Sequence, residues 1–370
     1  MHSLFIRGAV SLALLVFVAP FARAETLVPF PLQQATVPYP TVEWPENKHP
    51  AVETVVERAF TGKQPPALAR VKAVLVVHQG QVVAERYANG ITRDTRLQSW
   101  SMAKSFLHAA LGLAIDDRRI SPDTSAPVPE WQGTNDPRKA ITIRQLAQMT
   151  DGLAFKEDYG DANAEVMQML FGAGRGDVGR AAAEAKLRAT PGTRWSYSSG
   201  SANVLSRILR DRLGGREQYR AFLHDKLFAP LGLKSALPEF DASGTWIASS
   251  YVRATARDFA RFGLLYLRGG FWDGRQIIPG AWVDTARTPT AASNGYYGAL
   301  FWLNAIDRAT GKPAVTPHVP TDTFFARGFG GQLITIIPSR DTVVVMSNLA
   351  YVEDTEAIAK LLGDILKALP

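Results

Sequence analysis

One apolar run, from Leu97 to Leu113, constrains the fold more than any other stretch of this chain. After Ser101 the run contains good helix formers and apolar side chains all round, which is typical of a helix buried on every face. Other elements must then pack around this helix, and a chain with 46% hydrophobic residues can supply them. Ser101 and Lys104 occupy the first predicted turn, three residues apart and therefore on one face.

Ser101 and Lys104 have the chemistry of a nucleophile and its proton acceptor. A serine hydroxyl is a poor nucleophile at neutral pH, whereas a buried lysine loses its proton more easily than an exposed one. The N-terminus of a helix also favours developing negative charge. The alternative is a helix cap followed by a snorkelling lysine. The S-x-x-K spacing in an apolar setting favours the interpretation as a serine acyl-transfer site.

The first 24 residues predict an export signal. Arg7 supplies a basic region, residues 8–20 are apolar, and Ala22-Arg23-Ala24 has the pattern of a cleavage site. The apolar stretch is shorter than the roughly 20 residues that span a bilayer. We therefore expect a periplasmic or secreted protein that is cleaved after Ala24 and has no membrane role beyond export; an uncleaved leader kept as an anchor is the alternative.

Composition excludes several classes of function. The net charge of +7 is spread along the chain, without the clustered Lys and Arg that nucleic-acid binding requires. The absence of cysteine excludes a disulfide scaffold and a thiol nucleophile. The histidines do not occur at metal-ligand spacings, so we expect no metal and no other cofactor. His108 shares the Ser101 face, but seven residues place it about 10 Å away along a helix, which predicts a buried structural histidine.

Two predicted hairpins lie near the ends of the chain, with helices between them. Residues 25–50 are rich in proline and predict an extended lead-in along the surface. The predicted strands are 71–78, 81–87, 333–337 and 342–346. The predicted helices are 51–60, 143–149, 179–187, 201–213, 216–228, 254–267, 279–287 and 355–369.

Strands from both ends of the chain predict one shared sheet. The fold class is therefore α+β, an antiparallel sheet flanked by helices with an inserted, mostly helical domain. We assign residues 51–115 and 238–370 to the sheet domain and 116–237 to the helical domain. The glycine-rich segment 172–176 has neither a strand-loop-helix setting nor a Gly-Lys-Ser ending, so we expect a surface loop rather than a phosphate loop.

Two further segments supply candidate site residues. Residues 191–200 predict a turn before a helix, where Tyr197 would relay a proton, its pKa lowered by a lysine ammonium. A tyrosine bonded to its own loop is the alternative. Residues 326–332 place glycines at the entrance of a strand, where the backbone N–H of Phe329 would join that of Ser101 in an oxyanion hole. The alternative is a glycine bulge.

Together and in this order, the three segments resemble the serine β-lactamase and penicillin-binding-protein superfamily. The resemblance is strongest to its class C-like branch of esterases, D-aminopeptidases and 6-aminohexanoate-dimer hydrolases. It covers about residues 51–370 and includes further matches at 146–153, 230–233, 254–263 and 297–298.

The resemblance implies a role for each residue of the site. Ser101 would be acylated, Lys104 and Tyr197 would transfer protons, and the N–H groups of Ser101 and Phe329 would bind the oxyanion. It also implies a β-lactamase/transpeptidase-like sandwich that holds the site against the helical domain. The sequence leaves open whether Lys104 or Tyr197 is the base.

Two departures from the family point away from lactam substrates. Ala326-Arg327-Gly328 stands where the lactamases carry Lys-Thr-Gly, and Tyr197-Ser198-Ser199 stands where many carry Tyr-x-Asn. Both changes remove groups that hold a β-lactam, and both favour an esterase or amidase.

The hypothesis is therefore an exported serine hydrolase acting on a small ester, amide or peptide substrate. Arg327 would pair with a substrate carboxylate, and Gly328 and Ser199 are further candidate substrate contacts. The alternatives are a β-lactamase or D-Ala-D-Ala peptidase, and a non-catalytic penicillin-binding-like sensor.

Overall fold

The computed structural model describes residues 27–350 and 355–370. The predicted export signal at 1–24 lies outside these residues. Within the described ranges, no helix is both long enough and apolar enough to cross a membrane.

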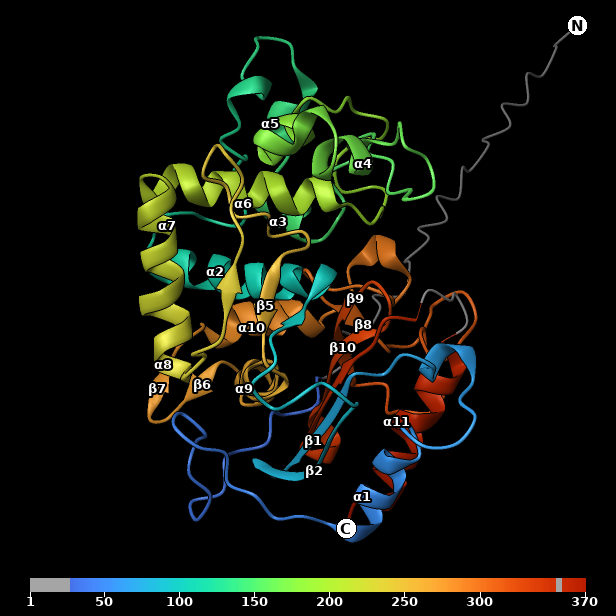
Figure 1. Ribbon diagram of the computed structural model, residues 1–370. Helices are drawn as coiled ribbons and strands as arrows, with labels where there is room; N and C mark the ends of the chain where they lie inside the picture. Colours follow the sequence, from blue (N-terminus) through green and yellow to red (C-terminus); the bar gives the residue numbers. More distant parts are fainter. Residues whose placement is uncertain (1–26, 351–354) are drawn as a thin grey trace, which may run out of the picture.

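A six-stranded antiparallel sheet brings the two ends of the chain together (Figure 1). Its strand order is β2-β1-β11-β10-β9-β8, so the two predicted hairpins join through the pairing of β1 with β11. The strands are β1 (Ala73–His78), β2 (Gln81–Tyr87), β8 (Trp302–Leu303), β9 (Phe324–Gly328), β10 (Gln332–Ile337) and β11 (Thr342–Ser347). Every residue of β1, β10 and β11 is buried, as expected for strands covered on both faces.

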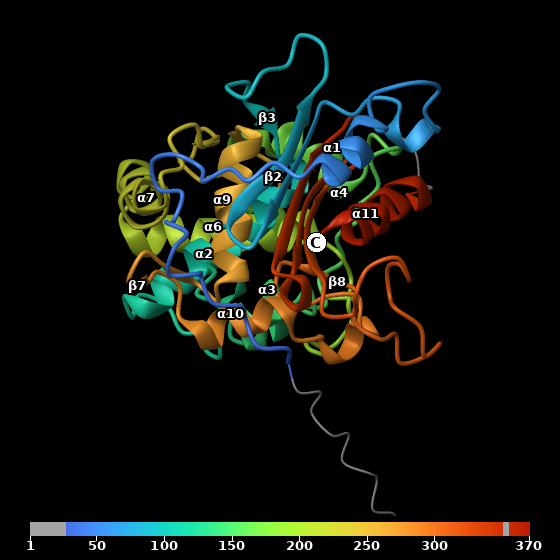
Figure 2. The ribbon, with the colours of Figure 1, turned by 90° about the horizontal axis from the view of Figure 1, so that it is seen from below.

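Helices cover both faces of this sheet (Figure 2). The helices are α1 (Pro50–Glu57) and α11 (Glu356–Ala368) on one face, and α9 (Ala256–Leu267) and α2 (Ala103–Asp116) on the other. Because side chains alternate along a strand, Val74 packs with α1 and α11, whereas Leu75 packs with α9 and α2. The predicted α+β class, with an antiparallel sheet flanked by helices, is confirmed.

A helical region lies between the two hairpins in the chain. It contains α3 (Ile143–Ala147), α4 (Glu165–Leu170), α5 (Val178–Ala183), α6 (Ser199–Leu213), α7 (Arg216–Leu223) and α8 (Ala229–Leu231). Helices α3 to α6 lie in the upper part of Figure 1, and α7 and α8 run down its left side. Helix α2 contacts both α6 of this region and β9 of the sheet. Its residues from Ala103 to Ala114 are all buried, as the apolar run predicted.

Short elements complete the fold and fix the start of α2. They are the three-stranded sheet of β3 (Leu97–Gln98), β5 (Val252–Ala254) and β4 (Leu237–Pro238), the hairpin of β6 (Phe271–Trp272) and β7 (Arg275–Gln276), and α10 (Gly280–Arg287). Strand β3 pairs with β5 directly before Ser101, so a sheet anchors the chain at that point.

Some element boundaries differ from those predicted. Helix α5 ends at Ala183, and Leu187 instead forms a bridge with Leu153. The predicted helix 216–228 changes to a π-helical turn over His224–Phe228. Residues 173–176 form a 3₁₀ turn, and residues 326–328 belong to strand β9 rather than to a loop.

The lead-in from residue 27 to residue 49 runs along the sheet domain, where arginine side chains from α9 and the turn after it bind it (blue in Figure 2). Arg261 Nε donates to the Pro40 carbonyl at 2.6 Å, and Arg268 Nε donates to Gln33 Oε1 at 2.9 Å. These bonds to charged donors compensate for the poor helix and strand propensity of a proline-rich segment.

Candidate active site

Ser101 lies in a 3₁₀ turn, Trp100–Met102, immediately before α2. Trp100 has φ of +46°, which a non-glycine residue adopts only when its surroundings hold it there. Two bonds do so: Ser99 N donates to the Val252 carbonyl, and Val252 N donates to Ser99 Oγ, each at 3.0 Å. The turn that carries Ser101 is therefore fixed by its neighbours rather than by local propensity.

Lys104 is 1% exposed and its Nζ points at Ser101. Nζ lies 3.1 Å from Ser101 Oγ, 3.1 Å from Ser199 Oγ and 2.8 Å from the Ser249 carbonyl oxygen. Burial lowers the pKa of Lys104 to about 8, and the negative charge of Glu157 partly opposes this shift. At pH 7 about a tenth of the lysine is therefore uncharged and able to accept a proton, and above pH 8 most of it is.

Tyr197 lies beside the same pair. The Lys104 Nζ is 4.8 Å from the centre of the Tyr197 ring. The ring packs against Tyr297 and Trp302. Burial raises the pKa of Tyr197 well above its usual value, so the predicted lowering by the lysine is wrong. The cost of burying a phenolate exceeds the attraction of the ammonium, and the phenol stays protonated.

Phe329 begins the turn that joins β9 to β10, next to the Ser101 turn. The rings of Trp100 and Phe329 lie 5.9 Å apart, edge to face. Strand β9 approaches so closely that a Cβ on Gly328 would lie 2.2 Å from the Ser99 carbonyl oxygen, which requires glycine there. The glycines lie in a hairpin turn at the entrance of β10, and this turn packs the Phe329 ring against Trp100, the residue before Ser101.

Ser199, the first residue of α6, is buried behind Lys104. Its hydroxyl contacts Lys104 Nζ and donates to Glu157 Oε1 at 2.5 Å, while its backbone N–H donates to Glu157 Oε2 at 2.7 Å. These bonds correct its prediction as a substrate contact, because its side chain is enclosed. Glu157 was not predicted as a site residue, because it lies in an acidic loop whose sequence is typical of a solvated segment.

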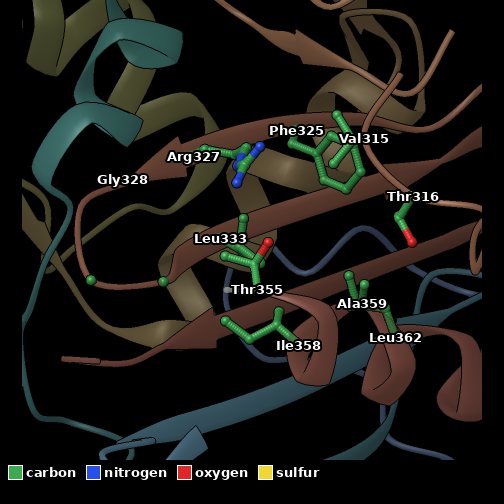
Figure 3. Close-up of a pocket in the computed structure, with 12 residues that line it drawn as sticks. Val315, Thr316, Phe325, Arg327, Gly328, Leu333, Thr355, Ile358, Ala359 and Leu362 are labelled. Carbon is green, nitrogen blue, oxygen red and sulfur yellow. The ribbon is translucent and has the colours of Figure 1, made fainter. Parts of the chain in front are cut away.

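Arg327 projects from β9 toward a cavity of about 240 Å³ beneath the Phe329 turn (Figure 3). The other lining side chains are mostly apolar: Val315, Phe325, Leu333, Ile358, Ala359 and Leu362. The centre of the guanidinium lies 5.3 Å from that of the Trp302 ring, and burial lowers the pKa of Arg327. Within the part of the chain that the structure describes, Arg327 forms no salt bridge. A partly buried cation beside an apolar cavity is suited to an anionic ligand with an aliphatic arm.

The Beta-lactamase family model matches residues 67–366, most of the chain and all of the site described above. The protein belongs to the β-lactamase family. This confirms the predicted superfamily, and members of the family include hydrolases such as 6-aminohexanoate-dimer hydrolase and carboxylesterases. The β-lactamase-family protein described here is an enzyme, a serine hydrolase.

One relative in sequence and two solved structures are similar to this chain. The 6-aminohexanoate-dimer hydrolase of Paenarthrobacter ureafaciens is 28% identical over 296 residues, which are 74% of this chain and 71% of that protein. A Bacillus anthracis protein described as a 6-aminohexanoate-dimer hydrolase has a TM-score of 0.72 at 22% identity, covering 90% of each chain. A family VIII carboxylesterase has a TM-score of 0.64 at 13% identity, covering 88% of this chain and 99% of that one. The last two show the shared fold.

His108 of this β-lactamase-family protein is a structural residue, as the distance argument predicted. Its Nδ1 is 2.7 Å from the Tyr266 hydroxyl, and its Nε2 is 3.1 Å from Thr285 Oγ1. Burial lowers the pKa of His108 to about 3, so the ring stays neutral. A neutral imidazole with both nitrogens engaged ties α2 to α9 and α10.

Proposed function

We propose that this protein is an exported serine hydrolase that cleaves an ester or a linear amide bond through an acyl-Ser101 intermediate. The observation that carries the proposal is the 3.1 Å contact between Lys104 Nζ and Ser101 Oγ. Burial gives the lysine a pKa of about 8, close to the pH at which a general base works best. Export rests on the signal pattern of residues 1–24.

The proposal assigns a group to each step of the reaction. Ser101 Oγ attacks the carbonyl carbon while its proton moves to the proton-transfer pair, Lys104 and Tyr197. The backbone N–H groups of Ser101 and Phe329 stabilise the negative oxygen of the tetrahedral intermediate. Tyr197, which stays protonated, is suited to passing a proton to the leaving alcohol or amine. Water then attacks the acyl-enzyme by the reverse route and releases the acid.

Three features favour an ester or linear amide over a lactam. Arg327 occupies the position of the lactamase Lys-Thr-Gly threonine and adjoins an apolar cavity. Ser199, where many lactamases carry an amide side chain, is engaged with Glu157 rather than open to a substrate. The relative from Paenarthrobacter ureafaciens carries a name that denotes hydrolysis of a linear amide.

A panel of four substrates tests the proposed activity. We expect the purified protein to hydrolyse nitrophenyl butyrate or the linear 6-aminohexanoate dimer, with little turnover of a chromogenic cephalosporin or a D-Ala-D-Ala peptide. Initial rates identify the substrate class, and intact mass after rapid quenching detects the acyl group on Ser101. Preferred turnover of the cephalosporin or the D-Ala-D-Ala peptide would favour the lactamase or peptidase alternative. Stable acylation without turnover would favour a penicillin-binding-like sensor.

Arg327 is proposed to bind a carboxylate on the substrate. Replacing Arg327 with leucine is expected to lower the ratio of kcat/KM for a carboxylate-bearing nitrophenyl ester over its neutral analogue by about tenfold, the effect of one lost charge-assisted pair. Most of the change should appear in KM for the acidic ester.

The exposed Arg308 provides a matched control for Arg327. The Arg308→Leu variant removes the same charge from the chain and should keep the wild-type ratio. An unchanged ratio in Arg327→Leu would show that Arg327 does not recognise a carboxylate.

A further inference from the structure

The Nζ of Lys104 has a complete set of three oxygen neighbours, and their chemistry differs. The Ser249 oxygen is a backbone carbonyl, which only accepts a hydrogen bond, so one N–H of Lys104 is directed to it at 2.8 Å. The hydroxyls of Ser101 and Ser199 can each either donate or accept. The direction of the Ser199 hydroxyl therefore decides how the remaining positions on Nζ are used.

Glu157 fixes that direction. A carboxylate oxygen only accepts, so the Ser199 hydroxyl proton is committed to Glu157 Oε1 at 2.5 Å. The second carboxylate oxygen is held by the Ser199 backbone N–H at 2.7 Å, and Tyr159 donates to Glu157 Oε1 at 3.2 Å. With its proton committed, Ser199 Oγ can only accept from Lys104. It takes the second N–H of Nζ.

The third position on Nζ then faces Ser101. In neutral Lys104 the two hydrogens are directed to Ser249 and Ser199, so the nitrogen lone pair is left for the Ser101 hydroxyl, 3.1 Å away. The proton of Ser101 Oγ can move directly onto this lone pair as the oxygen forms its bond to the substrate carbonyl.

We infer that Glu157 is a positioning residue that makes Lys104, rather than Tyr197, the base for Ser101, by fixing the direction of the Ser199 hydroxyl. The inference rests on the proposed function, because it concerns the first step of that reaction. Glu157 bonds to Ser199 and not to Ser101 Oγ, so it acts through Ser199.

The charges around Nζ give the inference a second, electrostatic consequence. The titratable or charged side chains that face this cluster are Glu157 and Tyr159 before α4, Tyr197 before α6, Tyr297 before β8, and Arg327 on β9. Glu157 is the charged group that raises the pKa of Lys104 against the effect of burial. Removing the charge of Glu157 should therefore lower the pKa of Lys104. A substitution that only disturbed the local packing would leave this pKa unchanged.

Stoichiometric labelling of Ser101 by a fluorophosphonate tests this without requiring turnover. The serine oxygen forms a bond to phosphorus, the phosphorus–fluorine bond breaks, the proton passes to Lys104 and fluoride leaves. The rate is measured by intact mass from pH 5 to pH 10 in wild type, Glu157→Gln, Ser199→Ala and the double variant. Circular dichroism confirms that each variant is folded.

Four results are expected. Glu157→Gln should lower the labelling rate at the high-pH plateau by about 10- to 100-fold, the range for a misdirected catalytic group. The labelling rate of Glu157→Gln should also begin to rise at a lower pH than that of the wild type, because Lys104 loses its negative neighbour. Ser199→Ala should lower the plateau by a similar factor, and the double variant should be no slower than the slower single variant, since the two residues act in one chain.

Two further variants separate charge from structure. Asp158→Asn removes one negative charge from the adjacent position, where the side chain bonds to Gly160 and Lys156, and it should behave like wild type. Glu157→Asp keeps the negative charge, so its labelling rate should rise at the same pH as that of the wild type.

A Glu157→Gln variant with the wild-type plateau and pH dependence would overturn the inference, and so would multiplicative losses in the double variant. Absence of labelling at Ser101 in the wild type would overturn it as well. A wild type that is labelled at Ser101 but hydrolyses nothing in the substrate panel would instead reject the proposed function.

Discussion

Replacement of Ser101 by alanine is expected to lower kcat at least about 10⁴-fold, because it removes the only atom placed to form the acyl bond in this mechanism. The fold should be retained. Lys104 keeps two of its three oxygen neighbours, Ser199 and Ser249, and the turn before α2 is held by backbone and Ser99 bonds that do not involve the Ser101 hydroxyl.

Ser105 supplies a matched control on the same helix. It is also buried, and its hydroxyl donates to the Leu300 carbonyl at 2.9 Å, away from Lys104. Ser105→Ala should cost about 1 kcal/mol of stability and keep kcat within a few-fold of wild type. Steady-state rates on the best panel substrate and a thermal melt of both variants are sufficient. More than a tenth of wild-type activity in Ser101→Ala would reject Ser101 as the nucleophile.

Replacement of Lys104 by methionine is expected to separate activity from stability. Without the amine, kcat should fall by about 10³-fold, within the range that a general base contributes. In the wild type, kcat/KM should rise with pH and level off above about 8, where Lys104 has lost its proton. The residual activity of the methionine variant should lack that rise.

The difference in stability between wild type and Lys104→Met should depend on pH, whereas a loss of packing alone would change stability equally at every pH. In the folded state the pKa of Lys104 is about 8, against an ordinary value of 10.5, so below pH 8 the wild type bears the cost of a buried ammonium. That cost is about 3 kcal/mol at 1.36 kcal/mol per pKa unit. It disappears as pH rises from about 8 to 10.5, because over this range the unfolded state binds more protons than the folded one.

The free energy of unfolding of the wild type should therefore rise relative to that of Lys104→Met across this pH range. Urea unfolding at pH 7, 9 and 10.5 measures the difference. At pH 7 the methionine variant should be at least as stable as wild type, since it removes a buried charge and loses only hydrogen bonds to neutral oxygens. A constant difference at all three pH values would mean that Lys104 is not deprotonated in the folded protein above pH 8.

Local patterns made most of the helices and the two hairpins predictable, although α4 and α8 were not predicted. The apolar run after Ser101 predicted a buried helix. The strand-like apolar runs on either side of residues 79–80 and 338–341 predicted two hairpins with their turns at these residues. Ser101 and Lys104 were predictable for the same reason, since a spacing of three residues on a helix brings two side chains together without reference to the rest of the chain.

The remainder of the site depends on contacts between distant parts of the chain. Glu157 meets Ser199 across 42 residues, and nothing in the loop around Glu157 marks it as different from other acidic surface loops. The pKa of Tyr197 was predicted in the wrong direction because the prediction took account of a nearby ammonium but not of burial. The sequence of a turn does not show how deeply its tyrosine is buried. Strand β9 was missed because Arg327 and Gly328 have poor strand propensity, and only pairing with β10 makes them a strand.

The pairing of β1 with β11 determines when the six-stranded sheet can be completed during synthesis. Residue 73 pairs with residue 347 and residue 78 with residue 342, so the sheet closes only after almost the entire chain has emerged from the ribosome or from an export channel. Until then the early hairpin has an unpaired apolar edge that is open to intermolecular pairing. Such long-range closure is slow, and a chain interrupted before residue 342 would lack the strand that shields that edge.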